Sequence, residues 1–327
     1  MTDPAEHPNP PSDLETLLRT PGFDESTVID DIAAIATRLP TLGQVVGVTV
    51  AGPVIMNAVG VHATPVRVGD PLRIGTDEIV LRLNPSRLSS TLLTDPSAQV
   101  PPTLRLFDLH GNTSHATYLT DDSDRMAFES LAATARPFDD TTGLRPVPDE
   151  LDVLPTFSRM VGVEQHTWFG ADSRHDADCG DQVGMFDSIL TDGGVSRRMA
   201  LAAGRARGVR VDARRVVAAL EHAALLGMIA TAATAAPGCI QMRQGRLHGA
   251  REHRGQMVLA SGESRVMINF NHVTECWVTW SQGPWGETAA IELYDRASRC
   301  CLVLTHAGAV ARATFDAWDH LTGDLVG

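Results

Sequence analysis

The spacing of apolar side chains predicts where helices and strands lie in the first half of the chain. Residues 14–39 carry apolar side chains at helical spacing, interrupted at Pro21-Gly22. From residue 45 the pattern becomes β-rich, with a hairpin predicted over residues 104–119 and its turn at residues 110–112. A helix over residues 124–134 follows, for which Ser123 is the expected cap.

The second half of the chain has the same order of patterns. Helices are predicted over residues 182–203 and 212–225, the second capped by Asp212. Strand patterns then occupy residues 229–304, before a last helix over residues 311–321. Each half therefore has helices, a set of antiparallel strands and one closing helix, which is an α+β arrangement.

The two halves also share residues at matching positions about 185 residues apart. The matched positions are Leu42-Gly43 with Leu226-Gly227, Pro53 with Pro237, Phe107-Asp108 with Tyr294-Asp295, Arg125 with Arg312, and Phe128 with Phe315. Anchors in one order at nearly one spacing indicate two diverged copies of one unit. Because ligand sites favour interfaces between such units, a functional cleft is expected where the halves meet.

The chain divides at its most proline-rich and polar segments. We expect residues 1–13 to form a disordered tail and residues 14–134 a first repeat. Residues 135–155 hold four prolines and many carboxylates and are the expected linker, so residues 156–327 form a second repeat. The expected fold class is α+β, with two tandem repeats that each have a large antiparallel sheet and flanking helices.

Composition narrows the class of protein. The chain has 327 residues, and a hydrophobic fraction of 43% is typical of a globular protein. Its net charge of −13 argues against a nucleic-acid-binding surface. No run of apolar residues is long enough to span a membrane, and the N-terminus lacks a signal-peptide core. Five cysteines without a CxxC pair fit a reducing cytoplasm.

Short catalytic motifs are absent, but one polar segment concentrates metal-binding side chains. No GxGxxG, Walker A, GxSxG or HExxH motif occurs. His166, His175 and Cys179 lie in a segment that also holds Asp176 and Asp178, and imidazole and thiolate suit iron or zinc. The same composition is typical of an exposed polar loop before a helix, and both interpretations stay open.

Four segments resemble the bacterial haemin-degrading, haem-trafficking protein family. Residues 106–119, LFDLHGNTSHATYL, resemble its FFDxxGxAVHKxYL hairpin, and residues 194–201, GVSRRMAL, resemble its xVSRxxALxLAG helix. Residues 237–245, PGCIQMRQG, are similar to its NPGCIQIHxG strand and turn, and residues 291–295, IELYD, to its SLELFD. The family's tandem repeats of large antiparallel sheets are the fold that this resemblance implies.

The resemblance also implies a ligand and a site. The family binds haem between its halves, through arginines of both halves and an axial histidine. Arg197 matches the arginine of the VSR motif and Arg82 matches the first-half arginine, whereas Gly184 stands at the histidine position and Gln282 near a family lysine. A ferric haem needs an axial donor, which glycine lacks, so His175, Cys179 or His166 are the candidate substitutes.

The sequence therefore predicts a cytoplasmic protein that binds haem between its repeats and serves haem trafficking or degradation. The alternatives are a non-haem module for another anionic small molecule, or a haem-dependent enzyme with an open pocket. Whether the protein is an enzyme stays open. Neither a nucleic acid nor a membrane is an expected partner, whereas a protein that delivers or accepts haem is.

Overall fold

A computed structural model describes residues 11–21, 23, 27–29, 31–75, 78–95, 100–134, 136–137, 181–307 and 311–327. The first half contains these elements: α1 (Asp13–Leu18), β1 (Thr27–Ile29), α2 (Ile32–Arg38), η1 (Leu39–Leu42), β2 (Gly43–Ala51), β3 (Val54–His62), β4 (Val66–Arg67), β5 (Glu78–Leu83), η2 (Pro85–Arg87), β6 (Leu88–Thr94), β7 (Thr103–Asp108), β8 (Thr113–Ser123), α3 (Arg125–Ala132) and β9 (Arg136–Pro137).

The second half has a similar order of helices and strands. Its elements are α5 (Gln182–Asp192), α6 (Val195–Ala202), β10 (Gly208–Val211), α7 (Ala213–Leu225), β11 (Ile229–Ala236), β12 (Cys239–Arg246), β13 (Gly249–His253), β14 (Gln256–Ser261), β15 (Ser264–Asn269), η3 (Phe270–His272), β16 (Glu275–Gly283), β17 (Gly286–Tyr294), β18 (Cys300–Thr305) and α8 (Arg312–Val326). In the described part, no helix is long and apolar enough to cross a membrane.

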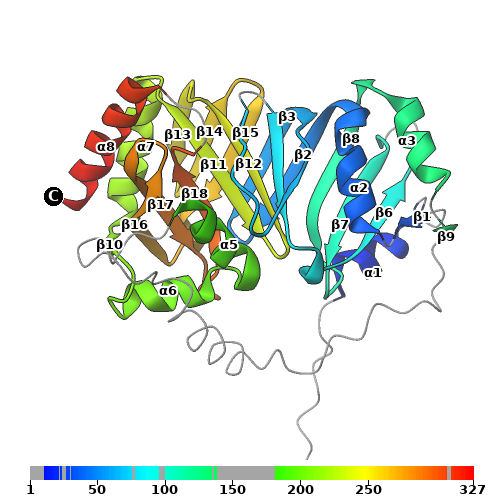
Figure 1. Cartoon of the computed structure of the whole chain (residues 1–327), viewed down its shortest axis with the longest axis horizontal. Coiled ribbons are helices and arrows are strands. Elements are labelled where there is room, and N and C mark those ends of the chain that lie inside the picture. Colours follow the sequence, from blue (N-terminus) through cyan, green and yellow to red (C-terminus); the bar gives the residue numbers. More distant parts are fainter. Residues whose placement is uncertain are drawn as a thin grey trace, which may run out of the picture.

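The two repeats exchange strands, so each large sheet contains segments from both halves. One sheet runs β1–β6–β7–β8–β2–β3 and continues into β15–β14–β13, with Met267 opposite Ile55. The other runs β10–β16–β17–β18–β11–β12 and continues into β5, with Cys239 opposite Leu83. Figure 1 shows strands of both halves side by side at the centre of the molecule. The α+β tandem-repeat prediction is confirmed, and the exchange places the seam between repeats inside the sheets.

Equivalent turns show how closely the two copies correspond. Asp108 Oδ1 accepts the backbone N–H groups of His110 and Asn112, both at 2.8 Å. Asp295 Oδ1 accepts those of Ala297 and Arg299 at 2.8 and 2.9 Å. Both aspartates hold the same kind of hairpin turn, because each carboxylate satisfies backbone donors that the turn would leave unpaired. The predicted hairpin between β7 and β8 is also confirmed.

Several predicted elements are shorter than expected. The region predicted as helical over residues 14–39 is divided into α1, β1 and α2, because Thr27–Ile29 pairs with β6. The helix predicted over residues 182–203 is divided at Gly193 and Gly194, whose φ angles of 72° and 78° are left-handed. Asp124, not Ser123, caps α3 through its side chain, whereas the predicted Asp212 cap of α7 is confirmed.

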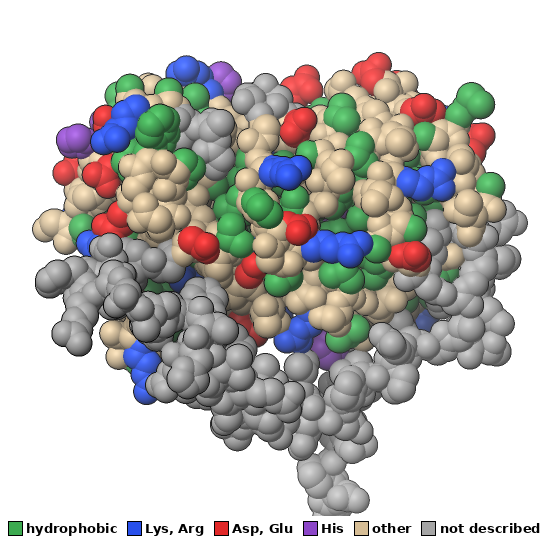
Figure 2. Space-filling view, in the orientation of Figure 1, with side chains coloured by type: hydrophobic (Ala, Val, Ile, Leu, Met, Phe, Trp, Pro, Cys, Tyr) green, Lys and Arg blue, Asp and Glu red, His purple; other side chains and the backbone are tan. Residues whose placement is uncertain are grey.

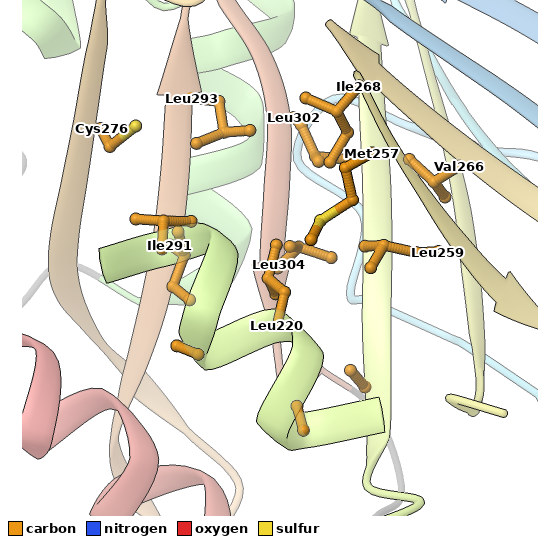
Figure 3. Packing of buried hydrophobic residues seen from close by; sticks show 14 of the residues in the cluster. Leu220, Met257, Leu259, Val266, Ile268, Cys276, Ile291, Leu293, Leu302 and Leu304 are labelled. Carbon is orange, nitrogen blue, oxygen red and sulfur yellow. The ribbon is translucent and has the colours of Figure 1, made fainter. Parts of the chain in front are cut away.

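Each sheet buries a helix-covered core. Helices α2 and α3 pack on strands of the first repeat around Leu39, Leu81 and Phe128. Helices α7 and α8 pack where β14 and β15 of one sheet approach β17 and β18 of the other. Figure 3 shows Leu220 of α7 beneath apolar side chains from both sheets, including Met257. One helix therefore ties the two sheets together through the burial of apolar surface.

Candidate functional site

The seam between the repeats carries a fully buried arginine. Arg82 lies on β5, opposite Ile240 of β12, and its side chain is 0% exposed. Its Nε donates to Asp187 Oδ1 at 2.6 Å, and a terminal guanidinium nitrogen lies 2.6 Å from the same oxygen. Its other terminal nitrogen donates to the Asp70 carbonyl oxygen at 3.0 Å. The first repeat thus reaches α5 of the second repeat through one ion pair.

Asp187 is the partner that sequence reasoning missed. It lies on α5 three positions after Gly184, so the two share one face of the helix. Its second oxygen accepts the backbone N–H of Gly69 at 2.8 Å. Both carboxylate oxygens are therefore satisfied, one by a guanidinium and one by the main chain, while 16% of the side chain stays exposed.

Arg197 makes a second, separate ion pair under α6. Its Nε donates to both oxygens of Glu292 at 2.9 and 3.0 Å, and a terminal nitrogen donates to Oε1 at 2.6 Å. Glu292 is 0% exposed and also accepts hydroxyl hydrogen bonds from Thr279 and Tyr294. Burial raises the pKa of Glu292, but Arg197 and these hydrogen bonds outweigh it, so the pKa lies below its ordinary value.

Gly184 and Gln282 both lie near the start of α5. The backbone N–H of Gly184 donates to the capping Asp181 side chain at 2.6 Å, and Asp181 forms a parallel bridge with the exposed Gln282. Gln182 anchors the same turn, because its Nε2 donates to the His306 carbonyl oxygen at 2.7 Å. The structure therefore groups Gly184, Gln282 and the Arg82–Asp187 pair around one helix, and places Arg197 against β17.

The other predicted ligands, His166, His175 and Cys179, lie outside the described residues. Within the described ranges, no group of three or more His, Cys, Asp or Glu side chains is arranged to hold a metal ion. The backbone carbonyl of His306 contacts Gln182 at the start of α5. The ring of His306 points elsewhere: its Nε2 lies 2.6 Å from the Ile229 carbonyl oxygen, and the ring stacks on Trp318. His306 is thus engaged in the core and does not replace the missing axial histidine.

A signal for the second missed acid was present in the sequence. In β17, Ile291 and Leu293 alternate with Glu292 and Tyr294, so the acid and the phenol share one face. A carboxylate within a strand that is buried on both faces needs a cationic partner, and Arg197 supplies it. No comparable pattern marks Asp187, which stands among polar residues of an amphipathic helix.

Comparison with known proteins agrees with this architecture. Residues 194–325 match the protein family described as the haemin-degrading HemS.ChuX domain. No curated protein matches the chain. Among solved structures, the fold is similar to apo-PhuS, a heme-binding protein from Pseudomonas aeruginosa, with a TM-score of 0.67, 17% identity and coverage of 92% of this chain and 87% of that one.

The fold of this chain is also similar to that of the heme-degrading enzyme ChuS from Escherichia coli O157:H7. The TM-score is 0.70 and the identity 19%, with coverage of 93% of this chain and 87% of that chain. At these identities the two structures establish the fold. Residues 194–325 therefore carry a haemin-degrading HemS.ChuX domain, as the sequence motifs predicted for the second repeat.

The site only partly fits the ligand that this family implies. Two arginines suit the two propionates of a haem, because a guanidinium pairs with a carboxylate through two parallel hydrogen bonds. In this chain both arginines already pair with internal carboxylates, Asp187 and Glu292. Gly184 offers no side-chain donor to iron. An anionic ligand must therefore displace a carboxylate, and an iron ligand must come from elsewhere.

Proposed function

We propose that this protein binds haem as cargo in cellular haem utilisation, in the seam bordered by the start of α5 and by β5. The single observation that carries the proposal is the ion pair between Arg82 of the first repeat and Asp187 of α5, three residues after Gly184. Helix α5 directly precedes the segment that matches the HemS.ChuX domain, residues 194–325. A buried guanidinium in an acidic chain is a specific place for a carboxylate-bearing ligand.

The proposed role is haem trafficking or the supply of haem for degradation, in the cytoplasm. Four cysteines, Cys239, Cys276, Cys300 and Cys301, are free and buried, which suits a reducing compartment. A protein that delivers or accepts haem would be the partner. On the face drawn in Figure 2, the basic side chains are scattered among acidic and apolar ones, which does not favour a nucleic acid there.

The test is a haemin titration of the purified full-length protein, followed by absorbance. We expect a saturable Soret band near one equivalent. The proposed axial donors are His175, Cys179 and His166, so His175→Ala and Cys179→Ala are compared with the exposed His272→Ala as a matched control. A band position altered by one of the first two substitutions, and not by the control, identifies the axial ligand.

A second candidate function has its own observation. Gly184 offers iron no donor, and both arginines are already paired with internal carboxylates, so none of these residues favours a porphyrin over a smaller carboxylate-bearing molecule. In that case the protein is a non-haem binding module on the same fold. Haemin would then give only a linear, unsaturated rise in absorbance, and this result would exclude the haem-cargo function.

A further inference from the structure

The side chain of Asp187 is bound by two groups that could also bind the carboxylate of a ligand, the Arg82 guanidinium and the backbone N–H of Gly69. We propose that the Arg82 guanidinium and the backbone N–H of Gly69 form a receptor for a ligand carboxylate, and that the ligand enters by displacing Asp187. We call Arg82 and the Gly69 N–H the carboxylate site. The proposal rests on the function proposed above, because a haem propionate is the ligand group in question.

The contacts of Asp187 are those that a bound carboxylate would make. One oxygen receives the guanidinium at 2.6 Å and the other receives a main-chain N–H at 2.8 Å. Charge-assisted bonds of this kind are the strong ones, and a planar guanidinium selects a planar carboxylate over a spherical anion. The chemical class of the ligand group is therefore a carboxylate, and a porphyrin propionate is one example.

Burial explains why the site must always hold an anion. Arg82 is 0% exposed, so removal of Asp187 without replacement would leave an unpaired charge away from water. Exchange of Asp187 for a ligand carboxylate keeps this charge balanced. Asp187 is the partly exposed member, at 16%, so once displaced it turns to solvent and its charge is hydrated.

The position of Gly69 leaves room for the exchange. Its φ is +87°, and no heavy atom would lie within 4 Å of a Cβ placed there. Among the described residues, no side chain therefore covers the side of Gly69 toward which a Cβ would point.

The ion pair between Arg197 and Glu292 differs from the Arg82–Asp187 pair in the exposure of its carboxylate. Glu292 is 0% exposed and is held by Thr279 and Tyr294 as well as Arg197. Its displacement would leave a carboxylate without water and two hydroxyl groups without their acceptor, which is costly. Of the two arginines that the motifs single out, Arg82 is therefore the exchangeable one, and Arg197 is a fixed anchor of α6.

The test compares two porphyrins without iron, so that it does not depend on an axial ligand. Protoporphyrin IX carries two free propionates and its dimethyl ester carries none. Fluorescence titrations measure the affinity of wild type, Asp187→Asn and Glu275→Gln for both. Glu275 is the matched control, because it pairs with Arg198 on α6 and its loss removes the same charge.

We expect Asp187→Asn to bind protoporphyrin IX about tenfold more tightly than wild type does, within the usual range of coupling between competing groups. Its affinity for the dimethyl ester, and both affinities of Glu275→Gln, should equal those of wild type. Equal or weaker binding of protoporphyrin IX by Asp187→Asn overturns the proposal, as does failure of every protein to bind it.

A second measurement does not depend on how well the variant folds. In wild type, protoporphyrin IX should increase hydrogen exchange in α5, because the ligand replaces the contact that ties α5 to Gly69 and Arg82. Unchanged protection of α5 in the complex overturns the proposal. Binding of protoporphyrin IX with this behaviour, but without a saturable haemin Soret band, leaves the carboxylate site in place and refutes the haem function.

Discussion

Acid should destabilise the protein through a pair of buried histidines in the first repeat. His62 of β3 and His115 of β8 have ring centroids 5.6 Å apart, and neither is more than 1% exposed. The Thr117 hydroxyl lies 3.0 Å from His62 Nε2 and 3.2 Å from His115 Nε2. Burial lowers the pKa of His62 to about 4, and burial followed by repulsion from His62 lowers that of His115.

The direction of the effect follows from proton binding. Between the ordinary histidine pKa of 6.5 and the folded-state value of about 4, the unfolded chain takes up a proton that folded His62 excludes. The free energy of unfolding therefore falls as the pH falls through this window. Since one pKa unit corresponds to about 1.4 kcal/mol, His62 alone should remove about 2–3 kcal/mol between about pH 7.5 and pH 4.5.

Urea denaturation at several pH values measures this loss. Wild type is compared with His62→Asn, which lacks the titrating ring, and with His272→Asn, an exposed histidine on η3. His62→Asn should be less stable at neutral pH but should lose about 2–3 kcal/mol less on acidification. The reasoning is refuted if His62→Asn and wild type show the same dependence on pH.

Two further substitutions test the packing around α6. Glu292→Gln should lower the free energy of unfolding by about 3–5 kcal/mol, because Arg197 keeps its charge in a buried place, whereas Asp316→Asn in the exposed Arg312 pair should cost about 0–1 kcal/mol. Equal losses in urea denaturation would contradict this difference. Gly194→Ala should lower the melting temperature, because the residue has a φ of +78° and a Cβ would lie 2.9 Å from that of Cys300. Gly204→Ala, at a φ of +67° with open space around it, shares the backbone strain but not the clash, so the melting temperature of Gly194→Ala should be the lower of the two.

Local signals in the sequence predicted the elements, and long-range pairing decided how they assemble. The β7–β8 hairpin and the α7 cap follow from residues within a few positions of one another. The exchange of strands cannot be predicted from such local signals, because β3 pairs with β15 and β5 pairs with β12, which are more than a hundred residues away in the sequence. An internal repeat predicts two similar units without indicating which strands each unit gives to the other.

The candidate site was predictable to a similar extent. Motif positions identified Arg82 and Arg197, and the structure places both in buried ion pairs. Their partners were not identified, because the face of α5 that meets β5 depends on the exchanged strand. Asp187 resembles any polar residue of an amphipathic helix until Arg82 is placed beside it.

The central claim is that haem binds at the seam where Arg82 lies, and one comparison tests it most directly. Equilibrium haemin titrations are made with wild type, Arg82→Gln and Arg125→Gln, the last being an exposed arginine of α3 paired with Asp95. We predict a saturable Soret band for wild type and Arg125→Gln, and binding about tenfold weaker for Arg82→Gln, as loss of one charge-assisted contact implies. The account is contradicted if all three bind haemin equally, or if wild type shows no saturable band.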